Sequence, residues 1–100
     1  MPSRKDLDKY GREILDRTGW YALVFNFHKR LPKGIRGIPD WLCFRDNVTA
    51  VVEVKGDGDT IRDTQKKFKE LVTPHLGKNI IYRVVQDLSD WDELVNYRGT

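Results

Sequence analysis

Apolar residues recur along the chain with two different periods, and these periods predict where the helices and strands lie. From Ser3 to about Gly19 the period is three to four residues, which is typical of a helix with one buried face. Ser3 can cap this helix, and Gly19 is a natural stop. The apolar stripe consists of Leu7, Tyr10, Gly11, Ile14 and Leu15.

Three runs of strand length follow, at 20–27, 38–45 and 48–55. The first is nearly continuous in apolar and aromatic residues, as strands buried on both faces are. The other two are separated by Asp46-Asn47, which predicts a two-residue hairpin turn. We therefore expect a β-hairpin after the first strand.

The rest of the chain predicts a second helix, a fourth strand and a short last helix. The second helix begins after Asp59 or Thr60 and ends near Val72, before Pro74. Its apolar face consists of Ile61, Phe68, Leu71 and Val72. A strand at 79–86 and a helix capped by Ser89, with apolar Trp91, Leu94 and Val95, complete the order αβββαβα in a single domain, 1–100.

The hairpin has a register that can be worked out from its turn. If Arg45 pairs with Val48, then Asp40 lies opposite Glu53 on the same face, with Cβ atoms about 4.5–5.5 Å apart. Lys55 is two residues beyond Glu53 and shares its face. Two opposed carboxylates repel unless a cation intervenes, and Mg²⁺ is commonly held by one or two carboxylates with water and phosphate oxygens. The alternative is a structural ion-pair cluster of the three side chains.

Gln65 falls within the apolar stripe of the second helix, four residues after Ile61 and three before Phe68. An inward-facing glutamine needs hydrogen-bond partners. The carboxylate cluster at the end of the preceding strand can supply them, and local backbone is the alternative.

Composition and charge narrow the class of protein. Cys43 is the only cysteine, which excludes an intrachain disulfide and a cysteine-rich zinc site. No apolar run approaches the roughly 20 residues of a membrane span, and the first residues lack a signal peptide's apolar segment. We therefore expect a cytoplasmic protein that is not secreted and does not contact a membrane.

The formal net charge is +3, and residues 87–100 hold Arg98 against four acids, so the basic balance lies in residues 1–86. A basic body suits a polyanionic partner, although an ordinary soluble surface is also compatible with it. The loop at 29–37 carries no acid and enters the Asp40 strand, where it can contact phosphates. Its basic residues are Lys29, Arg30, Lys33 and Arg36, and the second helix adds Arg62, Lys66, Lys67 and Lys69.

Taken together, these segments resemble the PD-(D/E)XK nuclease superfamily. Gly37-Ile38-Pro39-Asp40, Glu53-Val54-Lys55-Gly56 and the later Gln65 are similar to the motifs of its VRR-NUC family. The resemblance implies an α/β fold with a restriction-endonuclease-like αβββαβ core, a mixed central sheet and flanking helices. Glu13 resembles the first-helix acid of many members, while its position alone fits either an inward-leaning or a solvated glutamate.

The resemblance further implies a Mg²⁺- or Mn²⁺-dependent DNA endonuclease. Asp40, Glu53 and the Val54 backbone carbonyl would ligate the metal, and Lys55 would orient the attacking water or stabilise charge on the phosphate. Glu13 would bind a second metal or contact the residues that ligate the first one. Gln65 would keep the groups around the nucleophile in place.

Free-standing VRR-NUC proteins resemble dimeric resolvases, which implies a homodimer that cuts branched DNA, in particular four-way (Holliday) junctions. The expected location is the cytoplasm of a bacterium, for a bacterial or phage-encoded protein. The helix with Trp91 is the expected dimer surface. The alternatives are a flap or single-strand nuclease on the same site, and a non-catalytic DNA-binding module with structural carboxylates.

Overall fold

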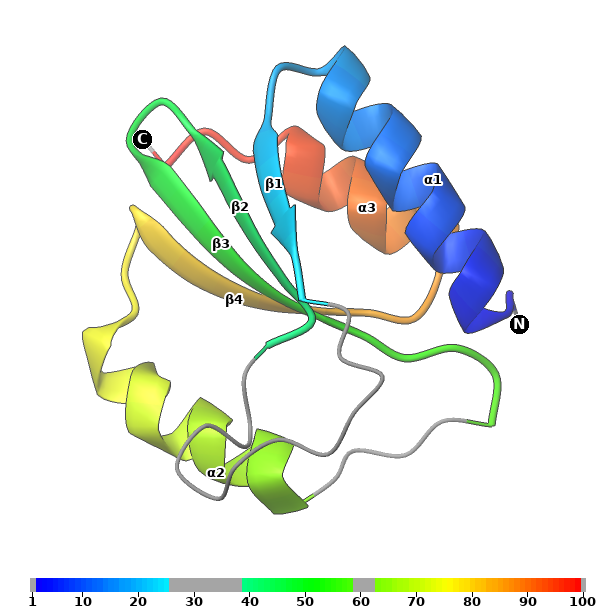
Figure 1. Cartoon of the computed structure of the whole chain (residues 1–100). Helices are drawn as coiled ribbons and strands as arrows, with labels where there is room; N and C mark the ends of the chain where they lie inside the picture. The colour runs from blue at the N-terminus through cyan, green and yellow to red at the C-terminus, as the bar shows by residue number, and fades with distance from the viewer. Residues whose placement is uncertain (1, 26–38, 59–62, 100) are drawn as a thin grey trace.

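The computed structural model of the chain describes residues 2–25, 39–58 and 63–99. The predicted order αβββαβα is confirmed, with one short 3₁₀ turn, η2, added after the second helix (Figure 1). The elements are α1 (Arg4–Arg17), β1 (Tyr21–Val24), β2 (Trp41–Arg45), β3 (Val48–Val54), α2 (Asp63–Val72), η2 (Thr73–His75), β4 (Ile80–Val85) and α3 (Leu88–Val95). Among the described helices, none is long and apolar enough to cross a membrane.

Helix α1 begins and ends where its sequence predicts. Ser3 is the N-cap, and its hydroxyl accepts a hydrogen bond from the backbone N–H of Asp6 at 3.1 Å. The helix stops at Arg17, and Gly19 follows with φ +84°, a left-handed conformation that favours glycine. The buried positions are Leu7, Gly11, Ile14 and Leu15.

The four strands form one mixed sheet in the order β1-β2-β3-β4. The first two pairings are antiparallel, whereas β4 runs parallel to β3. In the hairpin, Arg45 pairs with Val48 and Trp41 pairs with Val52, so the two-residue turn and the predicted register are confirmed. Asp46 adopts φ +53° in this turn, a conformation that Asp tolerates better than most residues.

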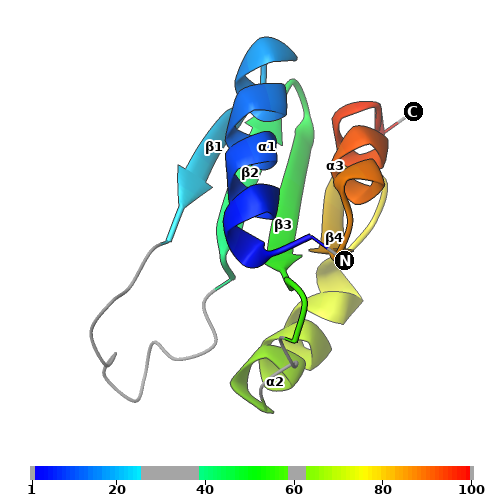
Figure 2. The same ribbon diagram turned by 90° about the vertical axis from the view of Figure 1, so that its right-hand side faces the viewer.

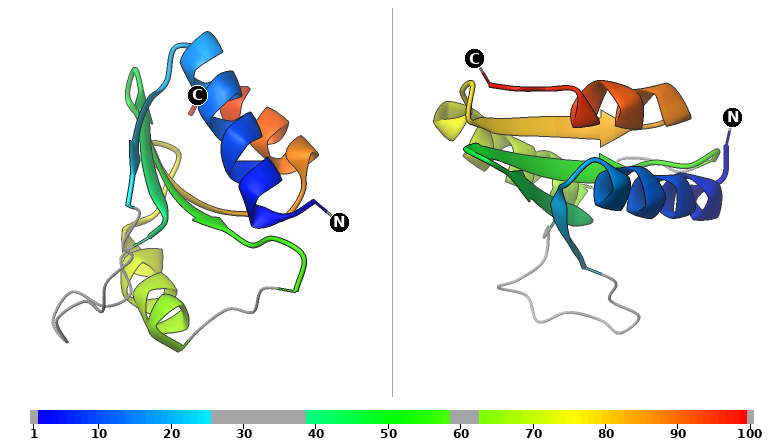
Figure 3. Two further views of the ribbon diagram at one scale, coloured as in Figure 1. Left: turned by 45° about the vertical axis from the view of Figure 1, so that its right-hand side comes forward. Right: turned by 90° about the horizontal axis from the view of Figure 1, so that it is seen from above.

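Helices α1 and α3 lie side by side on one face of the sheet, as Figures 1 and 2 show. Helix α2 lies apart from this pair, near the end of β3 (Figure 3). Because β3 and β4 are parallel, the chain crosses from one to the other through α2 and η2. The crossover therefore brings a helix next to the end of β3, where Glu53 and Lys55 lie.

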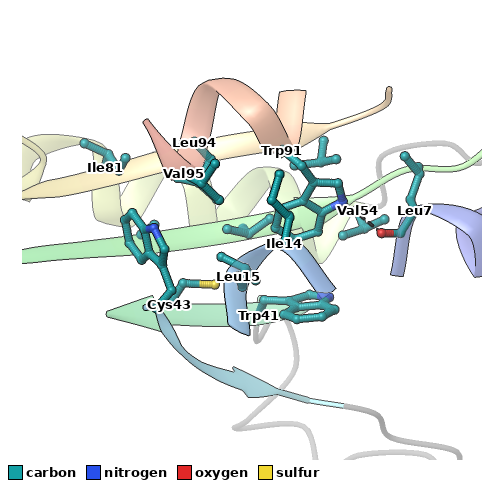
Figure 4. Packing of buried hydrophobic residues seen from close by; sticks show 14 of the residues in the cluster. Leu7, Ile14, Leu15, Trp41, Cys43, Val54, Ile81, Trp91, Leu94 and Val95 are labelled. Carbon is teal, nitrogen blue, oxygen red and sulfur yellow. Dashed lines mark hydrogen bonds between the residues drawn. The ribbon is translucent and has the colours of Figure 1, made fainter. Parts of the chain in front are cut away.

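The hydrophobic core fills the space between the sheet and the α1–α3 pair (Figure 4). Trp41 and Trp91 are at its centre, both almost fully buried, with ring centroids 5.3 Å apart in a T-shaped arrangement. The indole N–H of Trp91 donates to the backbone carbonyl of Leu7 at 2.9 Å, which ties α3 to α1. This packing fixes α1 against the sheet end that carries Asp40.

Strand β1 differs from the prediction of a strand buried on both faces. It lies at the edge of the sheet, its side chains alternate in exposure, and Tyr21 is 64% exposed. The run of apolar residues was misleading because only alternate β1 side chains face the helices. The predicted continuation through 26–27 lies outside the described residues.

The two later helices also differ in detail. Leu71, which was assigned to the apolar face of α2, is largely exposed, and Asp59, Thr60 and Ile61 lie outside the described residues. Helix α3 is capped by Asp87 rather than Ser89, through a capping box with Asp90.

The apolar side of α3 is not available to a partner. Trp91 and Leu94 are fully buried and Val95 nearly so, and all three pack in the core between α3, α1 and the sheet. The expectation that they form a dimer surface is therefore wrong, because closing the domain's own core already covers them.

Candidate active site

Asp40 and Glu53 come together at the end of the β2–β3 hairpin. The ladder ends with Trp41 opposite Val52, so Asp40 and Glu53 are the next residues along the two chains, and both residues are buried, at 7% and 1% exposure. Asp40 Oδ2 accepts a hydrogen bond of 2.8 Å from the backbone N–H of Val54, on the neighbouring strand. The hairpin alone thus fixes two carboxylates beside each other.

Lys55 and Gln65 complete a buried polar chain with Glu53. The side-chain N–H of Gln65 donates to Glu53 Oε2 at 2.8 Å, and Gln65 Oε1 accepts a hydrogen bond from Lys55 Nζ. Lys55 is 5% exposed and Gln65 2% exposed. Helix α2 therefore supplies the amide that joins the ammonium to the carboxylate, and the predicted inward direction of Gln65 is confirmed.

Two residues of α1 that the sequence did not single out also reach this site. Arg4 Nη2 lies 2.9 Å from Asp40 Oδ1, and Arg4 Nε lies 3.8 Å from Asp8 Oδ2. Asp8 Oδ1 is buried without a hydrogen-bond partner in the described part of the chain. The four-residue spacing of Arg4 and Asp8 was the available signal, because it places both on one side of the helix.

The electrostatics of Asp8 and Tyr82 reflect this concentration of negative charge. Burial raises the pKa of Asp8 above its ordinary value of 3.8, Arg4 acts in the opposite direction, and the charge of Asp40 adds to the rise. Burial also raises the pKa of Tyr82 to about 12, with further contributions from Glu53 and Asp40. Tyr82 therefore keeps its phenolic proton at neutral pH.

Glu13 does not join the cluster through its side chain. It is exposed on α1, and the place beside Asp40 belongs to Asp8 instead. The reason is the rotation of each side chain about the helix axis. At 3.6 residues per turn, Glu13 points roughly 140° away from the centre of the buried stripe, whereas Asp8 points roughly 75° away from it. A solvated helix glutamate is the description that fits Glu13.

The donor set suits a hard divalent cation. Asp40 and Glu53 offer carboxylate oxygens and Val54 a backbone carbonyl, which are the ligand types that Mg²⁺ and Mn²⁺ prefer, with water and phosphate oxygens completing the coordination. Oδ1 of Asp8, which is buried and has no hydrogen-bond partner among the described residues, is a further oxygen of the same kind. In the described residues no three His, Cys, Asp or Glu side chains are grouped as a ready-made metal cage. The residues thus fit a metal that keeps waters and substrate oxygens in its coordination.

Part of the predicted nucleic-acid surface can be placed. Lys66, Lys67 and Lys69 are exposed on α2, the helix that contributes Gln65 to the site. Lys29, Arg30, Lys33, Arg36 and Arg62 lie outside the described residues, as do Gly37 and Ile38 of the first motif.

The mixed sheet, its flanking helices and the buried Asp40, Glu53 and Lys55 are the arrangement that a restriction-endonuclease-like fold implies. The VRR-NUC domain family matches over residues 4–86, and the chain belongs to this family.

A solved structure described as a VRR_NUC domain has the same fold. It superposes with a TM-score of 0.69 at 23% sequence identity, covering 98% of this chain and 100% of the other. Comparison with curated proteins gives no match. The predicted family and fold class are therefore confirmed.

Proposed function

We propose that this nuclease-type domain is a Mg²⁺- or Mn²⁺-dependent DNA endonuclease that hydrolyses phosphodiester bonds in branched DNA. The observation that carries the proposal is the buried Asp40–Glu53 pair with Lys55 held beside it through Gln65. Burying this many charges is costly for a small domain. Function is the simplest reason for keeping them.

Each residue has a role that follows from its contacts. Asp40, Glu53 and the Val54 carbonyl would hold the cation, which when bound polarises the scissile phosphate and lowers the pKa of a bound water. Lys55 Nζ would orient the attacking water or stabilise charge that develops on the phosphate oxygens. Gln65 fixes the relative position of Lys55 and Glu53 through its two hydrogen bonds. Asp8, rather than Glu13, takes the part of the first-helix acid.

The substrate proposal follows from charge. The exposed lysines of α2, Lys66, Lys67 and Lys69, can contact phosphates, and phosphate contacts carry no base sequence, so recognition of DNA shape is favoured over sequence-specific cutting. Paired cuts in a four-way junction need two active sites, which favours a homodimer. Because the apolar side of α3 is buried, the dimer must use another surface, and light scattering at assay concentration tests whether the dimer forms.

The test is a cleavage assay on four-way junction, flap, duplex and single-stranded DNA, each with Mg²⁺, Mn²⁺ or EDTA. We expect metal-dependent cutting, with the junction cut fastest. Lys55→Ala and Asp40→Asn should remain folded by circular dichroism and still bind DNA, while cleavage falls by about 10²-fold or more. Lys78→Ala is the matched control, because Lys78 is exposed and precedes Ile80, which pairs with Thr49 near the start of β3, at the other end of that strand from Glu53.

The outcomes separate the alternatives. If a flap or a single strand is cut faster than the junction, the assigned active site stands and the proposed substrate is wrong. Binding without cutting under every metal favours a non-catalytic DNA-binding module. Full activity of Lys55→Ala or Asp40→Asn rules out the assigned active site.

A further inference from the structure

The guanidinium of Arg4 is a cation that lies at the candidate metal site. Its guanidinium lies 2.9 Å from Oδ1 of Asp40 and 3.8 Å from Oδ2 of Asp8. The other oxygen of Asp40, Oδ2, already accepts the Val54 N–H at 2.8 Å. Arg4 therefore neutralises the one oxygen of Asp40 that is not engaged by the hairpin backbone.

The backbone of Arg4 is held in this place by close packing. A Cβ on Gly56 would lie 2.2 Å from the Arg4 backbone nitrogen, so only glycine allows the start of α1 to approach the end of β3 this closely. The backbone N–H of Asp57 donates to the carbonyl of Pro2 at 3.1 Å. Figure 1 shows the N-terminus beside the segment that follows β3. The ion pair is thus built into the junction of α1 and β3.

The Arg4 side chain nevertheless keeps access to solvent. It is 43% exposed, whereas the Asp40 side chain is 9% exposed. A carboxylate oxygen that is paired with a guanidinium presents less negative charge to a second cation, and two cations at van der Waals distance repel each other. An exposed guanidinium can swing away from Asp40, while the buried carboxylate cannot follow it.

We propose that Arg4 is the resident counter-cation of Asp40 and Asp8 and competes with the divalent metal for Asp40. In metal-free protein it offsets the cost of a buried carboxylate next to Glu53. Metal binding at Asp40 then requires the guanidinium to leave Oδ1, so Arg4 lowers the affinity of the site for metal. This inference rests on the metal site of the proposed function and assigns to Arg4 a positioning role that acts through Asp40.

The test is calorimetric titration of the full chain with Mn²⁺ in the absence of DNA. We expect Arg4→Gln to lower the Kd for Mn²⁺ by about three- to tenfold, since a partly exposed charge at this distance alters a carboxylate's affinity for a cation by roughly that factor. Arg4→Lys, which keeps the charge, should stay within about twofold of wild type. Lys5→Gln is the matched control, because it removes one positive charge from the neighbouring exposed position of the same helix turn.

Thermal unfolding gives an independent reading. Without metal, Arg4→Gln should unfold at a lower temperature than wild type, because Asp40 loses its ion pair. With saturating Mn²⁺ the difference should shrink or vanish, whereas a purely structural Arg4 would lower the midpoint equally in both states.

The failures of the two proposals are distinguishable. If wild type shows no saturable Mn²⁺ binding, the metal site of the proposed function is wrong and this inference falls with it. If wild type binds Mn²⁺ but Arg4→Gln binds it equally or more weakly, the competition is overturned and the metal site stands.

Discussion

Asp8 is a carboxylic acid whose ionised form is disfavoured by burial. Burial raises its pKa, and Arg4 offsets this only in part. A raised pKa in the folded state means that the fold favours the protonated acid. The resulting stability is present below the ordinary value of 3.8 and is lost as the pH rises through the raised value. At neutral pH, ionised Asp8 therefore lowers stability.

We accordingly predict that Asp8→Asn raises the free energy of unfolding at pH 7 in metal-free buffer. The gain should be under about 1 kcal/mol, because Asp8 is partly exposed and keeps Arg4 as a partner. It should disappear below about pH 3.8, where Asp8 is protonated in both states. Urea unfolding across this pH range measures it, and a less stable variant at pH 7 would contradict the prediction. If Asp8 serves the reaction, the same variant cuts DNA more slowly.

Which site residues could be predicted depends on how local their placement is. Asp40, Glu53 and Lys55 follow from one turn and the two-residue period of strands, and Gln65 follows from the phase of its helix. Arg4 and Asp8 reach the site only because α1 docks at one particular height on the sheet. Gly56 and the tryptophan pair set that height, and no local pattern of the sequence encodes it.

At the scale of elements, the contact between α1 and α3 depends on a missing side chain. A Cβ on Gly11 would lie 2.4 Å from a ring carbon of Trp91. That ring cannot move cheaply, because it is fully buried, packs against Trp41 and donates to Leu7. Gly11 therefore sets how closely the two helices approach.

Replacing Gly11 by alanine should destabilise the protein even though alanine is the better helix former. The substitution gains about 1 kcal/mol of helix propensity, while overpacking a filled core typically costs about 1–3 kcal/mol. We therefore expect a net loss of up to about 2 kcal/mol in urea unfolding. Lys9→Ala, at an exposed position of the same helix, should change stability by less than about 0.5 kcal/mol. A Gly11→Ala variant more stable than wild type would show that the ring can shift.

The elements themselves were predictable where their signals were local and failed where burial was decided by neighbours. The cap and stripe of α1 and the hairpin turn are short-range features, and the structure confirms them. The exposure of β1 and of Leu71 depends on which surfaces the remaining helices cover. In α3, Ser89 and Asp87 both offer a capping side chain, and the cap is Asp87, which forms a capping box with Asp90.

For the whole molecule, charge is arranged so that a negative centre lies next to positive surfaces. Helix α2 turns Gln65 toward the buried carboxylates and presents Lys66, Lys67 and Lys69 to solvent. A DNA backbone attracted by these lysines would lie beside the site. Its phosphates would be repelled by the carboxylates and could enter the site only when a divalent cation screens that repulsion. DNA binding should therefore combine a strong dependence on salt with a dependence on metal.

The double variant Lys66→Glu/Lys67→Glu tests this arrangement. We expect weaker binding to DNA of every base sequence alike, because phosphate contacts carry no sequence information. The slope of log affinity against log salt should fall by about 0.9 for each lost phosphate contact. Fluorescence anisotropy with Ca²⁺ in place of Mg²⁺ measures both, and Mn²⁺ affinity should be unchanged. The control is the double variant Lys78→Glu/Arg98→Glu, which makes the same charge change at exposed positions outside α2. An equal loss of DNA affinity in the control would argue against a DNA surface on α2.

The β2–β3 hairpin also has a consequence for the order in which the domain folds. Its strands are joined by a two-residue turn, so their pairing closes a short loop and can form early. That pairing places Asp40 against Glu53, and like charges directly opposite destabilise a hairpin. The positive charges and the amide that relieve this repulsion come from Arg4 on α1, Lys55 beyond β3 and Gln65 on α2. The hairpin therefore becomes more stable as both helices dock, which couples assembly of the site to completion of the fold.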